Sequence, residues 1–209
     1  MTTSNEAYQR VREYFNSIVP FTKEEFDKVT SLAKPFRLKK GELIYEQGNV
    51  PEYGGFILQG CMRNFFTSDD GQEDTTVGFK FENTCFADLR SIFYEEPAIT
   101  SLQALEDTLI VRFEKADYLH LFDTCNSFAK LMLLVMEHRY NELINETIKR
   151  KNEQAEERYL KMLEDFPRIL QRVPQRYVAS YLGIKPQSLS RIRKNIMMQE
   201  RTTSIHRAA

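Results

Sequence analysis

Polar and basic side chains near the carboxyl end of the chain have the types and spacing needed to contact a nucleic acid. Gln187 and Arg191 are four residues apart, so on a helix they project from the same face. A glutamine amide pairs with adenine, and an arginine guanidinium pairs with guanine. Side chains at helix starts or beyond the centre of such a helix are better placed for phosphates. The residues predicted to contact nucleic acid are Arg176, Gln187, Ser188, Arg191, Arg193 and Lys194.

The elements that must position these side chains are two short helices within residues 173–194. Gly183 marks the turn between them, because glycine adopts positive φ at little cost. Pro186 suits the first turn of the second helix, where its missing N–H costs little. This layout is typical of a helix-turn-helix, whose second helix enters the DNA major groove; the alternative is a helical hairpin that only packs a core. The apolar positions with helical spacing are Val178, Ala179, Leu182, Ile184, Leu189 and Ile192.

Charge is divided unequally along the chain. Residues 166–209 contain nine Lys or Arg and one acid, a net charge of +8, within a chain whose total is -1. The rest of the chain is therefore acidic, at -9. Such asymmetry favours a carboxyl-terminal part that binds a polyanion. Arg191 is a candidate for base contact because its position faces away from the apolar residues of the second helix, whereas Arg193 and Lys194 fit phosphate contact and a solvated surface equally well.

The preceding sequence predicts a β domain flanked by helices. Helical spacing covers residues 6–31 and is interrupted by Pro20. Short apolar stretches separated by glycines follow from Phe36, which favours an antiparallel sandwich or barrel. Residues 127–152 then read as one helix of about 39 Å, and residues 155–166 as another. Residues 197–209 have no apolar period, so a loose tail is expected there.

The long helix needs a partner for its apolar stripe. Residues with near-helical spacing are Phe128, Leu131, Val135, His138, Leu143, Ile144 and Ile148. Packing against a second copy is favoured, because two-fold dimers are the commonest oligomers and helix-turn-helix proteins read paired half-sites. The alternative is that the stripe packs only on the chain's own β domain.

Several classes of function are disfavoured. The three cysteines form no C-x-x-C pair, and the three histidines lack metal-ligand spacing, so no metal site is predicted. No catalytic residue is predicted either, and the chain is not expected to be an enzyme. Free thiols are typical of a reducing cytosol. The first ten residues lack the apolar core of a signal peptide, and residues 131–136 are too short to span a bilayer. A cytoplasmic protein without membrane contact is expected.

In this order of elements, the chain resembles the Crp/Fnr family of bacterial transcription regulators. The resemblance rests on residues 38–48, 53–63, 86–93 and 158–194, and the last segment is most similar to the Bacteroidetes-type branch. It implies an α+β chain. The expected parts are a cyclic-nucleotide-binding-like antiparallel jelly roll as sensor in residues 1–125, a dimerisation helix in 126–154 and a winged helix-turn-helix in 155–209. The family's base-reading positions fall on Pro186, Gln187 and Arg191, of which Pro186 can offer only apolar contact.

The resemblance also implies an effector pocket in the jelly roll. The family's Gly-Glu-Leu segment, which holds the ribose and phosphate, reads Ala87, Asp88 and Leu89 here. The position of its phosphate-pairing arginine falls in residues 97–100, which contain no cation, so cyclic AMP is disfavoured as the effector. Arg90 and Arg63 are substitutes off the family's position. The predicted pocket residues are Ala87, Asp88, Leu89, Arg90, Ile99 and Thr100.

The sequence therefore predicts a sequence-specific regulator that binds double-stranded DNA as a homodimer under the control of an unknown small molecule. RNA polymerase is a further expected partner. The alternative is a small-molecule or protein sensor whose carboxyl-terminal domain docks on protein rather than DNA. Salt-steep association with duplex DNA would separate the two.

Overall fold

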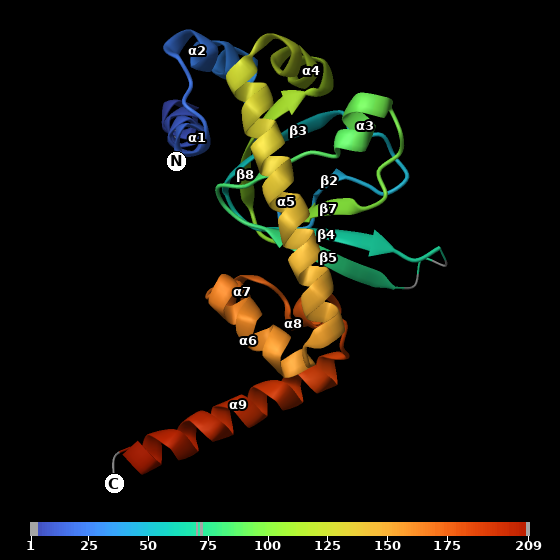
Figure 1. Cartoon of the computed structure of the whole chain (residues 1–209). Coiled ribbons are helices and arrows are strands. Elements are labelled where there is room, and N and C mark those ends of the chain that lie inside the picture. Colours follow the sequence, from blue (N-terminus) through green and yellow to red (C-terminus); the bar gives the residue numbers. More distant parts are fainter. Residues whose placement is uncertain (1–3, 70, 72, 208–209) are drawn as a thin grey trace.

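The computed structural model describes residues 4–69, 71 and 73–207. Figure 1 shows helices at both ends of the chain and two packed sheets between them. The first two helices are α1 (Ser4–Ile18) and α2 (Lys23–Leu32), separated by the break expected at Pro20. The strands are β1 (Lys34–Leu38), β2 (Leu43–Tyr45), β3 (Tyr53–Gln59), β4 (Met62–Thr67), β5 (Asp74–Lys80), β6 (Cys85–Phe86), β7 (Ser101–Ala104) and β8 (Thr108–Glu114). Helix α3 (Leu89–Tyr94) lies between β6 and β7.

The strands form a jelly roll of two four-stranded antiparallel sheets, as predicted. One sheet has the order β1-β8-β3-β6 and the other β2-β7-β4-β5. Apolar side chains from both sheets, among them Ile57, Met62, Leu102 and Ile110, fill the space between them. These four side chains are fully buried, so the interior of the roll is a packed core.

Helices cover the outer face of the β1-β8-β3-β6 sheet. After β8 the chain forms α4 (Lys115–Thr124) and α5 (Asn126–Asn152). Phe15 of α1, Val29 of α2, Leu121 of α4 and Phe128 of α5 share one buried cluster with Phe56 of β3. Burial of such large apolar side chains contributes roughly 1.5–3 kcal/mol each. The amino-terminal part of α5 is thereby held against the jelly roll.

The sequence predicted one apolar stripe along α5, and this prediction is wrong. Phe128 and Leu131 are buried and Val135 is partly buried against the chain's own β domain. Leu143 and Ile148 instead lie 47% and 53% exposed. The two sets lie on different faces of this 27-residue helix because, at 3.6 residues per turn, Leu143 and Ile148 do not return to the face that carries Phe128 and Leu131. The alternative of packing on the chain's own domain therefore holds for Phe128, Leu131 and Val135, and not for Leu143 and Ile148.

The carboxyl-terminal helices form a third core that includes residues of the jelly roll. They are α6 (Ala155–Asp165), α7 (Ile169–Arg172), α8 (Gln175–Tyr181) and α9 (Pro186–Arg207). Their buried cluster takes in Cys61 and Leu105, with Phe79 and Phe81 packed against it. The backbone N–H of Thr76 in β5 also donates to Ser180 Oγ in α8 over 2.9 Å. The helix-turn-helix is thus packed directly on the β2-β7-β4-β5 sheet (Figure 1).

Two expectations for the carboxyl end are wrong. Residues 197–207, predicted as a loose tail, continue the helix α9. No strand follows β8 in the described part of the chain up to residue 207, so the wing expected of a winged helix-turn-helix is absent there. Residues such as Met197, Met198 and Gln199 are good helix formers, and they outweigh the missing apolar period.

Candidate functional site

The turn of the helix-turn-helix is built as the sequence predicted. Gly183 has a φ of +68°, and the N–H of Ile184 donates to the carbonyl of Ala179 over 3.0 Å. Ala179 and Leu189 are fully buried, which lets α9 cross closely over α8. Of the six predicted core positions, Ile184 and Ile192 are partly buried and the others are buried. The turn therefore fixes which side of α9 faces outward.

The outward side of α9 carries most of the residues predicted to contact nucleic acid. Gln187, Arg191 and Lys194 are exposed, and Ser188 is partly buried beside Leu189. Pro186, the first residue of α9, is exposed as well. In Figure 1, α9 extends along the far end of the molecule from the jelly roll, so its outward side has no neighbouring element. This side of α9 is therefore accessible from outside the molecule.

Of the predicted phosphate contacts Arg193 and Arg176, only Arg193 is placed differently from the prediction. Arg193 is partly buried and forms a hydrogen bond with Tyr159 of α6. Its guanidinium therefore holds α9 against α6. Arg193 does not belong to a solvated surface, which was the other possibility that the sequence allowed. Arg176 is exposed, with Nη2 donating to the hydroxyl of Tyr177 over 2.8 Å. Arg176 lies at the start of α8 and remains accessible to an anion.

In the predicted effector pocket, Asp88 is engaged by the protein itself. Asp88 is the N-cap of α3, and its Oδ1 accepts from the backbone N–H of Ser91 over 3.0 Å and from Ser91 Oγ over 3.1 Å. A capping carboxylate satisfies a helix donor that would otherwise lack a partner. Ala87 and Leu89, on either side of it, are partly buried. Oδ1 of the Asp88 carboxylate is thus committed to capping the helix.

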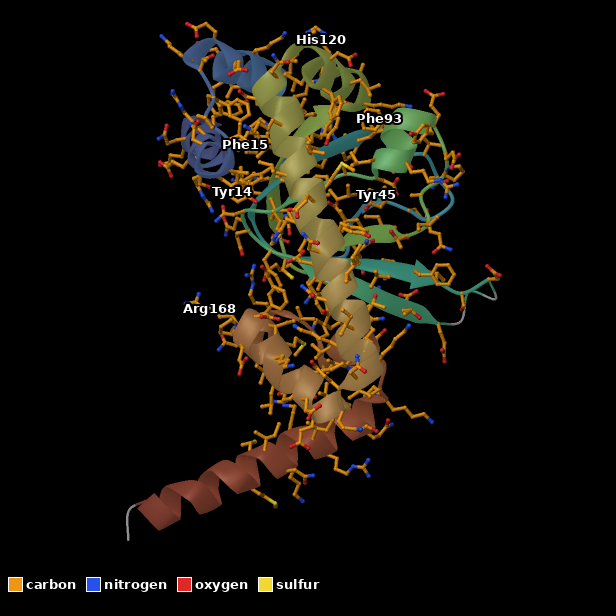
Figure 2. All side chains as sticks on the ribbon, viewed as in Figure 1. Tyr14, Phe15, Tyr45, Phe93, His120 and Arg168 are labelled. Atoms are coloured by element: carbon orange, nitrogen blue, oxygen red, sulfur yellow. The ribbon has the colours of Figure 1, made fainter. Side chains whose placement is uncertain are left out.

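A tyrosine that sequence reasoning missed lies beside Asp88. Tyr45 of β2 is 8% exposed, and its hydroxyl forms a hydrogen bond with Thr100. Burial, and then the charge of Asp88, raise the pKa of Tyr45, so the hydroxyl stays neutral. Figure 2 shows Tyr45 pointing toward the region of α3. The Tyr45 side chain therefore lies between Asp88 and Thr100, which belong to the two segments of the predicted pocket, and occupies space between these segments.

Two further residues of the predicted pocket, Arg90 and Ile99, are exposed. Arg90 is exposed and forms an ion pair with Glu96. Ile99 is 62% exposed. The nearest alternative cation, Arg63, is only 2% exposed and is sandwiched between the rings of Phe65 and Tyr177, at 3.9 and 3.8 Å from their centroids.

Arg63 instead connects the sensor to the helix-turn-helix. It lies in β4, and its Nη2 forms an ion pair with Asp74 of β5 over 2.8 Å. Tyr177, on one side of the guanidinium, belongs to α8. Stacking of arginine on aromatic faces is favourable when water is excluded. The residue proposed as an effector ligand thus lies between the two parts of the chain.

A second cation on this interface was also missed. Arg172 at the end of α7 pairs with Glu82, with two hydrogen bonds of 2.7 and 2.9 Å, and with Glu106. Burial alone would raise the pKa of Glu82, but the bonds from Arg172 and from the backbone of Gly60 lower it to about 2. The partners are 66 and 90 residues from Arg172, so no local pattern could reveal them.

Among the described residues, no helix combines the length and the apolar content needed to cross a bilayer.

Comparison with known proteins agrees with this architecture. Residues 35–125 match the family described as cyclic nucleotide-binding domain. No protein of curated function matches the chain in sequence. Among solved structures, FixK2 from Bradyrhizobium japonicum is similar with a TM-score of 0.69 and 16% identity, covering 80% of this chain and 86% of that one.

Two further structures extend the likeness. The c-di-GMP-responsive global regulator CLP from Xanthomonas campestris has a TM-score of 0.66 and 12% identity, with 86% of this chain and 93% of that one covered. The catabolite activator protein from Thermus thermophilus has a TM-score of 0.55 and 20% identity, with 90% and 88% covered. Residues 35–125 are therefore similar to cyclic nucleotide-binding domains, and the chain shares its fold with FixK2, CLP and the catabolite activator protein.

Proposed function

We propose that this protein is a sequence-specific DNA-binding transcription regulator. The observation that carries the proposal is the outward side of α9, where Gln187 and Arg191 are exposed while Leu189 between them is fully buried. Both side chains offer the paired hydrogen-bonding groups that read base edges in a major groove. The net charge of +8 over residues 166–209 supplies the sequence-independent attraction to phosphate. These features favour duplex DNA over a protein partner for α9.

We propose that the regulator acts as a homodimer. Helix α5 leaves apolar side chains exposed along one face, from Leu133 and Met136 to Tyr140 and Ile144. Spacings of three and four residues are those of a coiled-coil seam. Pairing this face with a second copy would bury it and place two α9 helices about a two-fold axis, as paired half-sites require.

We propose that cyclic AMP is not the effector. Residues 97–100 supply no cation for its phosphate, Asp88 caps α3, and Tyr45 is buried beside it. A cyclic phosphate without a charged partner forgoes roughly 1.5–3 kcal/mol. Titration of the full chain with cyclic AMP should leave its melting temperature unchanged, and a saturable rise would contradict this assignment. The proposed effector is an unidentified small molecule. We propose that the protein acts in the cytoplasm, contacts RNA polymerase as a further partner and has no catalytic role.

The DNA proposal is tested by the loss of one base contact. A bound fragment is first selected from genomic DNA, and its affinity is then measured by fluorescence anisotropy. Arg191→Ala should weaken binding by about 1–3 kcal/mol and relax specificity at one guanine. Arg37→Ala, which removes an exposed arginine from β1, is the matched control and should bind as the wild type does.

The same assay separates DNA binding from the alternative. Affinity should fall steeply as salt rises, because bound phosphates release counterions. A protein that binds no duplex at low ionic strength would instead be the sensor module whose carboxyl-terminal part docks on protein. Unchanged affinity of Arg191→Ala for a selected fragment would remove Arg191 from the reading face.

A further inference from the structure

A cavity of about 800 Å³ lies outside the jelly-roll interior, between the sensor and the carboxyl-terminal helices. Its walls come from α1, from the segment that joins β5 to β6, from α5 and from the α6–α7 connection. Figure 2 shows Tyr14 and Arg168, two of its lining residues, on the α1 side and the α7 side respectively. The volume is that of a site for a small organic molecule.

The walls are mainly apolar and aromatic. They include Tyr14, Ile18, Phe79, Phe81, Leu134 and Phe166. Leu134 lies on a different side of α5 from Leu133, Met136 and Tyr140, so a second copy packed on that exposed face leaves the cavity open. An apolar molecule in this space would exclude water from these rings, which is favourable in proportion to the area covered.

The charged groups of the lining leave two cations unneutralised. Arg172 is paired with Glu82 and Glu106, while Arg139 and His138 both contact Glu142. Asp165 faces Lys149. Within the described residues, Lys80 and Arg168 contact no carboxylate.

Lys80 is the better anchor of the two. Its Nζ donates to the carbonyl of Cys85 over 3.4 Å, which uses one of the three ammonium donors. Burial, followed by the charge of Arg139, lowers the pKa of Lys80 to about 8, although the charge of Glu142 acts in the opposite direction. Most of the molecules therefore still carry the ammonium at neutral pH. A partly buried cation with unused donors attracts an anion strongly. Arg168, exposed at the edge of the cavity, adds positive potential there.

We propose that this cavity binds a monocarboxylate with an aromatic or medium-length aliphatic body, its carboxylate on Lys80 Nζ and its body against the aromatic walls. Such a ligand would touch both the β5–β6 segment and the α6–α7 connection. It would therefore stabilise the docked position of the helix-turn-helix relative to the sensor. The binding claim is independent of the proposed function, and only its consequence for DNA affinity rests on that function.

The test uses the full chain and a series of phenyl-substituted carboxylates from phenylacetate to 6-phenylhexanoate. Isothermal titration calorimetry should show saturable binding that tightens with chain length, and 4-phenylbutyrate should bind at least tenfold more tightly than uncharged 4-phenylbutan-1-ol. Lys80→Met should abolish that preference while alcohol binding remains. Lys23→Met, which removes an exposed lysine of α2, should leave both affinities unchanged.

A second variant keeps the proposal testable if Lys80→Met does not fold. Leu134→Trp fills the cavity from α5 and should abolish binding of both acid and alcohol. Absence of saturable binding across the series at millimolar concentration, equal affinity for acid and alcohol, or wild-type affinity in Leu134→Trp would each overturn the proposal. Because these titrations contain no DNA, their failure is distinct from failure of the DNA-binding proposal.

Discussion

At the residue scale, a comparison of Gly41 with Gly60 distinguishes the cost of backbone strain from the cost of steric crowding. Gly41 and Gly60 have φ values of +92° and +112°, which disfavour any side chain. A Cβ on Gly41 would meet open space, whereas a Cβ on Gly60 would lie 2.4 Å from Thr108 Oγ1 and 2.8 Å from Thr108 Cα. The second contact involves backbone, so the side chain cannot simply rotate away. Gly60 is thus required twice, for its conformation and for the close approach of β8.

Gly41→Ala should therefore cost about 1–2 kcal/mol of unfolding free energy. Gly60→Ala should cost about 1–3 kcal/mol more, because overpacking adds to the same backbone strain. Urea unfolding of both variants, followed by circular dichroism, measures the difference. Equal losses in the two variants would show that β8 moves away from Gly60 without cost.

At the scale of elements, α7 is attached to the jelly roll through ionisable groups. Glu82 accepts two hydrogen bonds from Arg172, and its folded-state pKa of about 2 is below the ordinary 4.5. A carboxylate whose pKa is lowered on folding contributes stability above its unfolded pKa. That contribution is lost as the pH falls from about 4.5 to about 2. The attachment of α7 should weaken in acid.

Glu82→Gln should lower the unfolding free energy at neutral pH by about 1.5–3 kcal/mol, the contribution of hydrogen bonds to a charged group. The difference from wild type should shrink toward zero as the pH approaches about 2. Thermal unfolding of both proteins across this range makes the comparison. A difference that does not vary with pH would mean that the Glu82 charge is not what holds α7.

Local pattern reveals some of these elements and not others. The helix-turn-helix could be predicted because the turn glycine and its apolar neighbours lie within 22 residues, and the break at Pro20 because proline acts on its own helix. The roles of Arg63 and Arg172 could not, because their partners belong to distant strands and loops. Asp88 could have been identified as an N-cap from its place before Leu89–Tyr94.

The division of α5 into two faces is partly legible in the sequence. Phe128 and Ile148 were predicted to share a stripe, although 3.6 residues per turn place them on different faces and only Phe128 reaches the chain's own core. The residue types alone do not distinguish an apolar side chain that packs on its own domain from one that stays exposed. The distinction depends on where the jelly roll ends along α5.

At the scale of the whole molecule, the exposed face of α5 is the surface that we propose pairs two copies of the chain. Leu133 and Tyr140 are 63% and 64% exposed, and Met136 between them is 47% exposed. A contiguous apolar face of this kind on a soluble chain is typical of an interface. Opposite it, Phe128 and Leu131 hold α5 to the sensor. A dimer formed through this face would set the spacing of the two α9 helices.

Tyr140→Asp should convert the dimer to a monomer, because pairing would bury two uncompensated carboxylates near the two-fold axis. Sedimentation equilibrium of the full chain measures the mass. Leu160→Asp, at an exposed apolar position of α6, is the control and should stay dimeric. The monomer should keep its affinity for a single half-site but lose the gain from a two-fold symmetric site, since that gain comes from tethering the second reading helix. A Tyr140→Asp protein that remains dimeric, or a monomer with full affinity for the symmetric site, would show that α5 is not the dimerisation element.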